Sequence, residues 1–243
     1  MRFPLGGLQI DSFVAGSPES SILMQYNYQD TFPPVTRNLL ILNVLMLLAE
    51  WVLPRIGIDL VNLLGMHYFE ADSFGIHQLV TYMFLHDPGG ISHLFFNMFA
   101  LYMFGGLLER FWGPKKYLTY YLVTGIGAGL VQQMVWFLNM SPEIMPYSDL
   151  LITIGASGAI FGLLLAIGMI FPNLPLFILF VPIPVKAKYF VIVYGLIELW
   201  GGISGSAFGG GVAHFAHLGG MLFGIVLILI WRKRDKSRAD LYY

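Results

Sequence analysis

Six long apolar segments, separated by polar or proline-containing breaks, constrain the fold of this chain more than any other feature. Segments of this length and hydropathy are typical of helices that cross a lipid bilayer. The composition agrees, since 57% of the residues are hydrophobic and 11% are charged, with a mean hydropathy of +0.71, outside the range of soluble domains. The sequence therefore predicts an all-α, polytopic membrane bundle of six transmembrane helices. These span approximately residues 38–54, 91–109, 116–138, 153–171, 188–203 and 212–231.

The basic residues predict how this bundle is oriented. All but Arg55 of the 13 Lys and Arg residues fall on one side of a six-helix topology, and the side with excess positive charge is the cytoplasmic one. Residues 1–37 are therefore expected to form a short cytoplasmic N-terminal tail, without the apolar core of a cleaved signal peptide. Residues 38–232 form the membrane domain, and residues 233–243 form a basic cytoplasmic C-terminal tail. Both termini are then cytoplasmic.

The longest connection, residues 55–90, lies on the outer side in this topology. Its part from residue 74 to residue 86 is too short and too polar to cross the bilayer, so we predict an interfacial or re-entrant element. Ser92 is the expected N-cap of the second helix. We expect His67, His77 and His86 to lie at the membrane interface. Glu109, at the cytoplasmic end of the second helix, is expected to have a structural role.

Two short motifs lie at the same depth in two different apolar segments. Ser157 lies fifteen residues before Pro172, and His217 lies fifteen residues before Arg232. At a rise of 1.5 Å per residue, each interval corresponds to ~22 Å of helix. In a hydrocarbon core of about 30 Å, both side chains therefore lie about 8 Å beneath the outer face. A nucleophile and a base at one depth indicate hydrolysis within the membrane.

Two further polar side chains are expected in the same layer. His93 and Asn97 are four residues apart and share one face of the second helix. Polar residues inside a membrane are costly and normally face the bundle interior or a wet cavity, where they have a function. We therefore expect them to lie close to Ser157 and His217.

Glycines explain how a short serine side chain can reach a histidine on another helix. Gly158 and Gly162 form one small-xxx-small face, and Gly220 and Gly224 form another, so that two backbones can approach closely. We expect the fourth helix, 153–171, to be central, with its glycine-rich face against the second and sixth helices. Such motifs alone are also common in ordinary helix packing.

The motifs Gly155-Ala156-Ser157-Gly158, His217-Leu218-Gly219-Gly220-Met221-Leu222-Phe223-Gly224 and His93-Leu94-Phe95-Phe96-Asn97 resemble the GxSG, HxxGxxxG and HxxxN signatures of rhomboid intramembrane serine proteases. Gly105-Gly106-Leu107-Leu108-Glu109-Arg110, followed by Gly113, is similar to the segment after the second helix of that family. The resemblance covers about residues 38–232 in the order of the family. It implies a rhomboid-like fold and cleavage of transmembrane protein substrates near the outer end of their helices.

The resemblance also implies the roles of the site residues. Ser157 is the nucleophile, and His217 is the general base and later the general acid. His93, Asn97 and the backbone N–H of Ser157 stabilise the oxyanion. The family uses a Ser–His dyad and needs no carboxylate, so the roles of Glu50 and Glu198, the two acids embedded in the membrane, are left open.

Four other features are expected to support this site. Gly155 belongs to the serine motif, and Phe161, one turn after Ser157, is expected to pack on the His217 ring. His214 is three residues from His217, but no third metal ligand has a suitable spacing, so we expect no metal and place His214 at the wet cavity or at the entrance of the helix. The glycine-rich connection 201–211 is expected either to cover the site as a lid or to be a plain linker.

Composition limits the other possibilities. The chain has no cysteine, which excludes disulfides and thiolate chemistry, and no basic stripe points to nucleic acid. We expect no cofactor, and the expected partners are the lipid bilayer and transmembrane protein substrates, in an unspecified oligomeric state. Two alternatives remain: a non-catalytic rhomboid-like protein that binds transmembrane helices, and a proton-coupled transporter, which would need charged relays and internal repeats.

Overall fold

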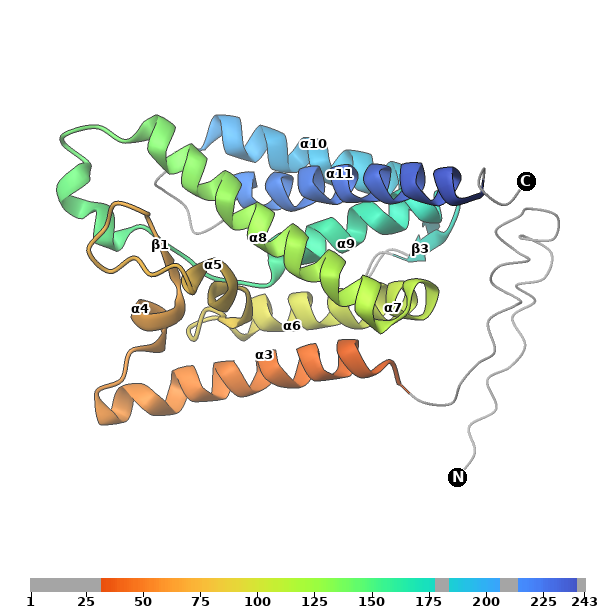
Figure 1. The fold of residues 1–243 in the computed structure, drawn as a ribbon. Helices are drawn as coiled ribbons and strands as arrows, with labels where there is room; N and C mark the ends of the chain where they lie inside the picture. Colours follow the sequence, from red (N-terminus) through yellow and green to blue (C-terminus); the bar gives the residue numbers. More distant parts are fainter. Residues whose placement is uncertain (1–31, 178–183, 206–213, 240–243) are drawn as a thin grey trace, which may run out of the picture. The chain divides into compact units, whose positions relative to one another are not determined.

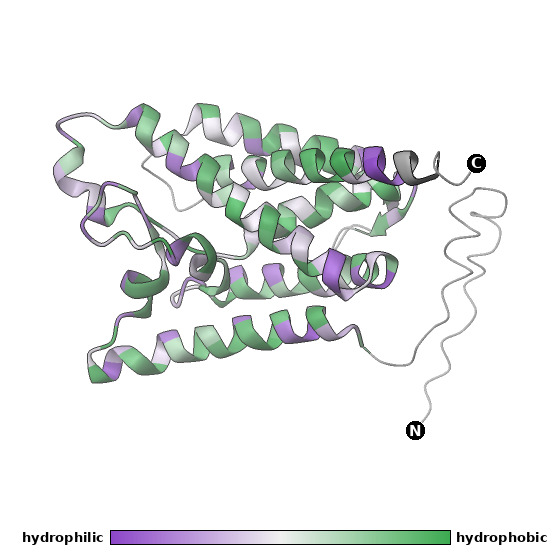
Figure 2. Cartoon of the chain, in the orientation of Figure 1, coloured by the Kyte–Doolittle hydropathy of each residue, from purple (hydrophilic) through white to green (hydrophobic). Residues whose placement is uncertain are grey.

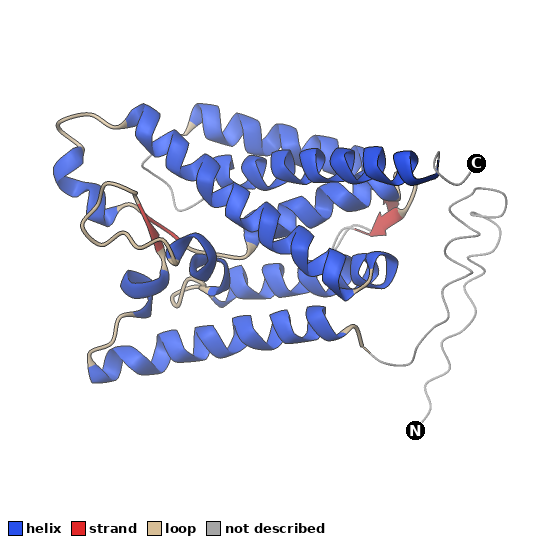
Figure 3. Ribbon diagram, in the orientation of Figure 1, coloured by secondary structure: helices blue, strands red, loops and turns tan. Residues whose placement is uncertain are grey.

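The computed structural model describes residues 32–177, 184–205 and 214–239. Most of these residues are helical, and the strands are short (Figure 3). Two of the strands form one antiparallel pair, in which β1 (Met66–His67) lies beside β2 (Ile152–Thr153). The other pair joins β3 (Pro175–Phe177) to β4 (Pro184–Lys186). The all-α class predicted from the sequence is therefore correct for the described part of the chain.

The long helices follow the six apolar segments (Figure 1). They are α3 (Pro34–Val52), α6 (Ile91–Ala100) with its continuation α7 (Gly106–Trp112), α8 (Pro114–Asn139), α9 (Ser157–Ile170), α10 (Ala187–Ser204) and α11 (His214–Ala239). Within the described residues, four helical spans are long and apolar enough to cross a membrane: Pro34–Ile56, Ile91–Trp112, Pro114–Asn139 and His214–Asp235. Helix α9 is apolar but shorter, with 14 residues.

Several helix boundaries differ from the predicted ones. Helix α3 begins at Pro34, because proline suits the first helical position, where no N–H is needed. The second segment is a helix with a π-helical turn, η3 (Leu101–Gly105), in its middle. Helix α9 begins at Ser157 rather than near residue 153, since β2 occupies the preceding residues. Helix α11 extends to Ala239, beyond the predicted start of the C-terminal tail.

Specific residues define one end each of α3, α6 and α7. Gly113 has φ of 79°, ends α7, and is followed by Pro114 at the start of α8. The prediction of Ser92 as the N-cap is wrong, because α6 begins at Ile91 with Gly90 as its N-cap.

Glu109 accepts hydrogen bonds from the backbone N–H groups of Val35 (2.9 Å) and Thr36 (2.7 Å) and from the Thr36 hydroxyl (2.8 Å). Its carboxylate thus binds the first turn of α3, a structural role as predicted.

The connection between α3 and α6 folds against the bundle. It contains η1 (Leu53–Ile56), α4 (Leu60–Leu64), β1, α5 (Gln78–Thr81) and η2 (Tyr82–Phe84). Its side chains enter the hydrophobic core, and the buried ones include Met66, Tyr68, Tyr82, Met83 and Leu85. His67 and His86, which the sequence places at the membrane interface, are fully buried inside the protein rather than exposed on its surface. His77 remains exposed, and its Nε2 lies 3.0 Å from the carbonyl oxygen of Leu63.

Helix α9 lies at the centre of the bundle, in contact with α8, α10 and α11 (Figure 1). The prediction of a central fourth helix is correct, but one partner of its glycine face differs. A Cβ on Gly158 would meet Ala128 of α8, and one on Gly162 would meet Thr124 of α8. Helix α11 contacts α9 through Gly220, whose Cβ would overlap the carbonyl oxygen of Gly158. The glycines therefore join α9 to α8 and α11, not to the second helix.

The long helices consist mostly of hydrophobic residues, drawn in green in Figure 2. Large hydrophobic side chains are exposed along them, among them Leu45, Leu138, Trp200 and Leu229. A soluble domain would bury such side chains, whereas a bilayer accepts them. The protein is therefore a multi-pass integral membrane protein.

Candidate active site

A cavity of about 940 Å³ opens between α6, α9, α10 and α11. Its lining consists mainly of aromatic and aliphatic side chains, together with several polar ones. Ser157, His217, His93 and Asn97 are four of the polar residues in this lining, which also includes Asp87, Ser92, Gln132 and Thr153. The structure therefore brings together, in one cavity, the four residues that the sequence places at one depth.

The chain turns sharply just before Ser157. Gly155 has φ of +124°, a conformation that L-residues with a side chain rarely adopt, and its N–H donates to the carbonyl of Tyr82 (2.9 Å). The pairing of β2 with β1 fixes the residues just before this turn. Ser157 is then the first residue of α9, where a backbone N–H has no partner within the helix.

His217 lies one turn into α11, and its Nε2 is 2.8 Å from the Ser157 Oγ. This distance is that of a hydrogen bond. Two glycines allow the close approach of the backbones that it requires. A Cβ on Gly219 would meet Val131 and Ala128 of α8, and Gly220 packs directly on Gly158 of α9. The two glycines after His217 thus allow α11 to pack closely against both α8 and α9.

Phe161 packs flat on the His217 imidazole. The ring centroids are 4.2 Å apart and the planes are inclined by 7°, so one face of the imidazole is covered by an apolar ring. Tyr194 of α10 contacts the same phenylalanine, with ring centroids 5.9 Å apart. The predicted contact between Phe161 and His217 is confirmed, and it limits the movement of the imidazole.

His93 and Asn97 project from α6 toward the serine motif. A Cβ on Gly155 would lie 3.1 Å from His93 Cε1 and 3.6 Å from Ser157 Oγ, so that the imidazole and the hydroxyl are both close to this glycine. A side chain here would be tight against the imidazole, and the backbone conformation of Gly155 would strain it. Asn97, one turn further along α6, is buried and lines the same cavity. Both side chains can offer N–H donors to an oxygen atom near Ser157.

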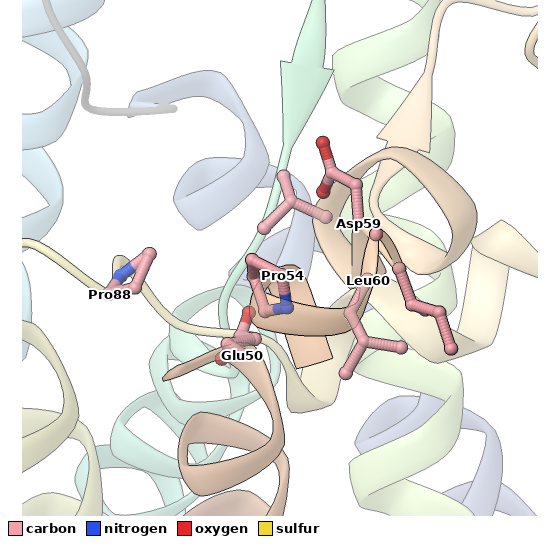
Figure 4. A pocket seen from close by; sticks show the side chains of 8 residues that line it. Glu50, Pro54, Asp59, Leu60 and Pro88 are labelled. Carbon is pink, nitrogen blue, oxygen red and sulfur yellow. The ribbon is translucent and has the colours of Figure 1, made fainter. Parts of the chain in front are cut away.

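The loop that leads into α6 is held by the end of α3. Both carboxylate oxygens of Glu50 lie 3.2 Å from the backbone nitrogen of His86. Trp51 Nε1 donates to the carbonyl of Pro88 (2.9 Å). Glu50 and Pro88 also line a second cavity of about 340 Å³, which shares no lining residue with the first and also contains Pro54, Asp59 and Leu60 (Figure 4). Glu50, whose role the sequence leaves open, therefore holds the loop before His93.

Glu198 is the site residue that sequence reasoning missed. Its Oε2 lies 2.9 Å from His217 Nδ1 and 2.7 Å from His214 Nδ1. Of the two places expected for His214, the structure shows the helix entrance: it is the first described residue of α11, it does not line the cavity, and its ring contacts Glu198 of α10. The one available signal was a carboxylate in an otherwise apolar helix, which a membrane tolerates only with a partner.

Two further expectations concern the glycine-rich connection before α11 and a metal site. Most of the glycine-rich connection 201–211 is not described, so the lid interpretation is not addressed. Within the described ranges, no group of three His, Asp or Glu side chains is arranged to hold a metal ion.

Comparison with known proteins gives an independent result. A family model described as Rhomboid domain matches residues 73–234. The chain is 32% identical over 169 residues to Rhomboid-like protein 11, chloroplastic, of Arabidopsis thaliana, an alignment that covers 68% of this chain and 55% of that protein. It is also 32% identical over 162 residues to Rhomboid protease AarA of Providencia stuartii, covering 61% and 53% of the two chains. The chain thus spans about half the length of these two relatives.

Proposed function

Because the chain belongs to the rhomboid family, we propose that it is an intramembrane serine endopeptidase that cleaves transmembrane protein substrates. The observation that carries this proposal is the 2.8 Å contact between Ser157 Oγ and His217 Nε2, in a cavity enclosed by apolar helices. A serine is a weak nucleophile unless a base lies within hydrogen-bond distance. The similarity to a relative named as a protease supports the same conclusion.

The reaction follows from this geometry. The Ser157 oxygen attacks the carbonyl carbon of the substrate peptide while His217 Nε2 takes the hydroxyl proton. The carbonyl oxygen becomes an oxyanion, for which His93, Asn97 and the Ser157 backbone N–H are the available donors. The C–N bond then breaks as His217 returns its proton to the amine. Water, activated by the same imidazole, hydrolyses the acyl-enzyme and releases Ser157.

The proposed topology has six crossings, with α9 and α10 added to the four long apolar spans. Helix α9 is buried between its neighbours, so it needs fewer apolar residues on its surface than a lipid-facing helix. Both termini are cytoplasmic in this proposal, because the basic residues lie on that side. The serine then lies near the outer face.

The cavity lining indicates how a substrate is bound. Phe96, Phe99 and Met103 of the second segment line the cavity together with Phe190 and Tyr194 of α10. An apolar lining of this kind suits the side chains of a transmembrane segment. A regular helix hides its carbonyl carbons, so we expect cleavage where glycine or proline interrupts the outer end of the substrate helix.

The test is cleavage of a labelled single-pass substrate with a Gly-Ala-rich outer end, in detergent and in liposomes. Wild type is expected to cleave, whereas Ser157→Ala and His217→Ala are not. Ser141→Ala and His77→Ala, which alter residues outside the cavity lining, serve as matched controls and should cleave normally.

The alternative is a non-catalytic rhomboid-like protein that binds transmembrane helices. It predicts that wild type and Ser157→Ala both retain the substrate without cutting it. Cleavage by the Ser157→Ala variant would contradict the proposed mechanism itself.

A further inference from the structure

Both histidines of α11 contact one carboxylate. His214 and His217 are three residues apart and share a helix face, and each presents its Nδ1 to the same oxygen of Glu198, at 2.7 Å and 2.9 Å. Glu198 itself lies on α10 with 6% of its surface exposed. The sequence resemblance implies a pair of residues, Ser157 and His217, whereas the structure extends that pair by a buried acid.

The direction of these hydrogen bonds depends on where the imidazole carries its proton. An ionised carboxylate only accepts, so Nδ1 of His217 must donate to Glu198. The Nε2 of a neutral His217 then has a free lone pair, directed at the Ser157 hydroxyl 2.8 Å away. This is the tautomer that a general base needs. The reversed tautomer would place a proton between Nε2 and the serine and leave Nδ1 and the carboxylate as two acceptors in contact.

The carboxylate also matters once the proton has moved. When His217 takes the serine proton, its imidazole becomes a cation 2.9 Å from Glu198. Because His217 and Glu198 are both buried, an isolated cation there is unfavourable, and an opposite charge at hydrogen-bond distance compensates for it. His214 supplies a second N–H to the same oxygen and so keeps the carboxylate partnered when it is buried.

We propose that Glu198 is a positioning residue that acts through His217, fixing its proton on Nδ1 and stabilising its charged form, so that the site works as a Ser157–His217–Glu198 chain. This inference rests on the proposed protease function. Phe161 restrains the plane of the imidazole by stacking, but an aromatic face cannot select between the two nitrogen atoms. Glu198 provides that selection.

The competing explanation is that Glu198 only ties α10 to α11. In that case the contact between the two helices would be weakened by the loss of either hydrogen bond. Loss of the shorter hydrogen bond, to His214, would weaken it more. The proposed positioning role depends on the His217 contact instead. Glu198→Gln and His214→Ala therefore separate the two explanations.

The experiment compares wild type, Glu198→Gln, His214→Ala and the control Glu109→Gln, which changes another buried carboxylate that contacts α3 and not the cavity. Two quantities are measured: the kcat and KM for a transmembrane substrate, and the side-chain ¹⁵N chemical shifts of His217, which report its tautomer. We expect Glu198→Gln to lower kcat by a factor on the order of 10² to 10⁴ with little change in KM. His214→Ala should lower kcat by a smaller factor than Glu198→Gln does. Glu109→Gln should have the wild-type kcat per folded molecule.

The spectroscopic result stands on its own. In wild type we expect the proton on Nδ1 of His217, and in Glu198→Gln a shift of population toward the Nε2 form. A wild-type His217 protonated on Nε2 would overturn the inference without any variant, which covers the case in which Glu198→Gln does not fold. An active wild type in which Glu198→Gln keeps its kcat, or in which His214→Ala loses as much as Glu198→Gln, would also overturn it.

Failure of the proposed function looks different. An inactive wild type would refute the protease, while the tautomer of His217 and its response to Glu198→Gln would still decide whether the carboxylate positions the imidazole.

Discussion

Adding one methyl group at Gly220 should separate the nucleophile from its base. A Cβ at this position would overlap the carbonyl oxygen of Gly158, and it would lie 2.8 Å from the carbonyl carbon. Carbon atoms in contact normally stay about 3.5–4.0 Å apart, so α9 and α11 must move apart by about 1 Å. The two atoms that the added Cβ would meet belong to the backbone of Gly158, so no flexible side chain can move away to relieve the clash.

The expected loss follows from that displacement. The hydrogen bond between Ser157 and His217, 2.8 Å in the structure, joins the same two helices a turn away. A misplacement of about 1 Å in a catalytic geometry lowers the rate by a factor on the order of 10². Overpacking adds a loss of about 1–3 kcal/mol in the free energy of unfolding.

The assay measures cleavage rate and thermal unfolding of Gly220→Ala beside a matched glycine. Gly106 on α7 has no atom within 4 Å of a Cβ built on it, so Gly106→Ala should keep full activity and gain up to about 1 kcal/mol from helix propensity. If Gly220→Ala has the rate and stability of wild type, the close contact between α9 and α11 does not position the dyad.

Three further predictions concern separate parts of the fold. Asn97→Ala should lower kcat about 10²-fold with a similar KM, because an oxyanion donor is lost; a kcat within threefold of wild type would argue against that role. Glu109→Ala should lower the free energy of unfolding by about 3 kcal/mol, since three donors of α3 lose their acceptor; an unchanged melting temperature in detergent would contradict this. Burial lowers the pKa of His86 to about 4 from 6.5, so the unfolded state binds more protons between these values, and acidification across this range should remove about 3 kcal/mol of stability. Unfolding of wild type and His86→Leu at pH 7 and pH 4.5 checks this, and an equal pH dependence in both would refute it.

The sequence indicates the depth of Ser157 and His217 in the membrane and the places where helix backbones approach closely. Ser157 and His217 each lie fifteen residues from a helix-ending residue, and a regular helix converts that count into a position along the membrane normal. The glycines after both residues indicate where backbones meet. From these two facts the contact of the two side chains can be predicted, although the glycines of α9 face α8 more than the second helix.

Rotation of a helix about its own axis is harder to obtain from sequence. Glu198 meets His217 only because α10 presents one particular face to α11, and an apolar helix has no strong amphipathic pattern that fixes this face. The histidines of the 55–90 connection pose a related problem. His67 and His86 are buried because that connection packs its own side chains, such as Tyr68 and Met83, into the core. Local sequence does not distinguish this arrangement from a helix at the membrane surface.

The most direct measurement is reaction of the purified protein with a fluorophosphonate, followed by mass spectrometry to locate the modified residue. A serine activated by His217 should be labelled at Ser157 in wild type, and His217→Ala should abolish the labelling while the protein remains folded. Absence of labelling in folded wild type, or labelling of Ser157 that persists without His217, would contradict the proposed nucleophile and base.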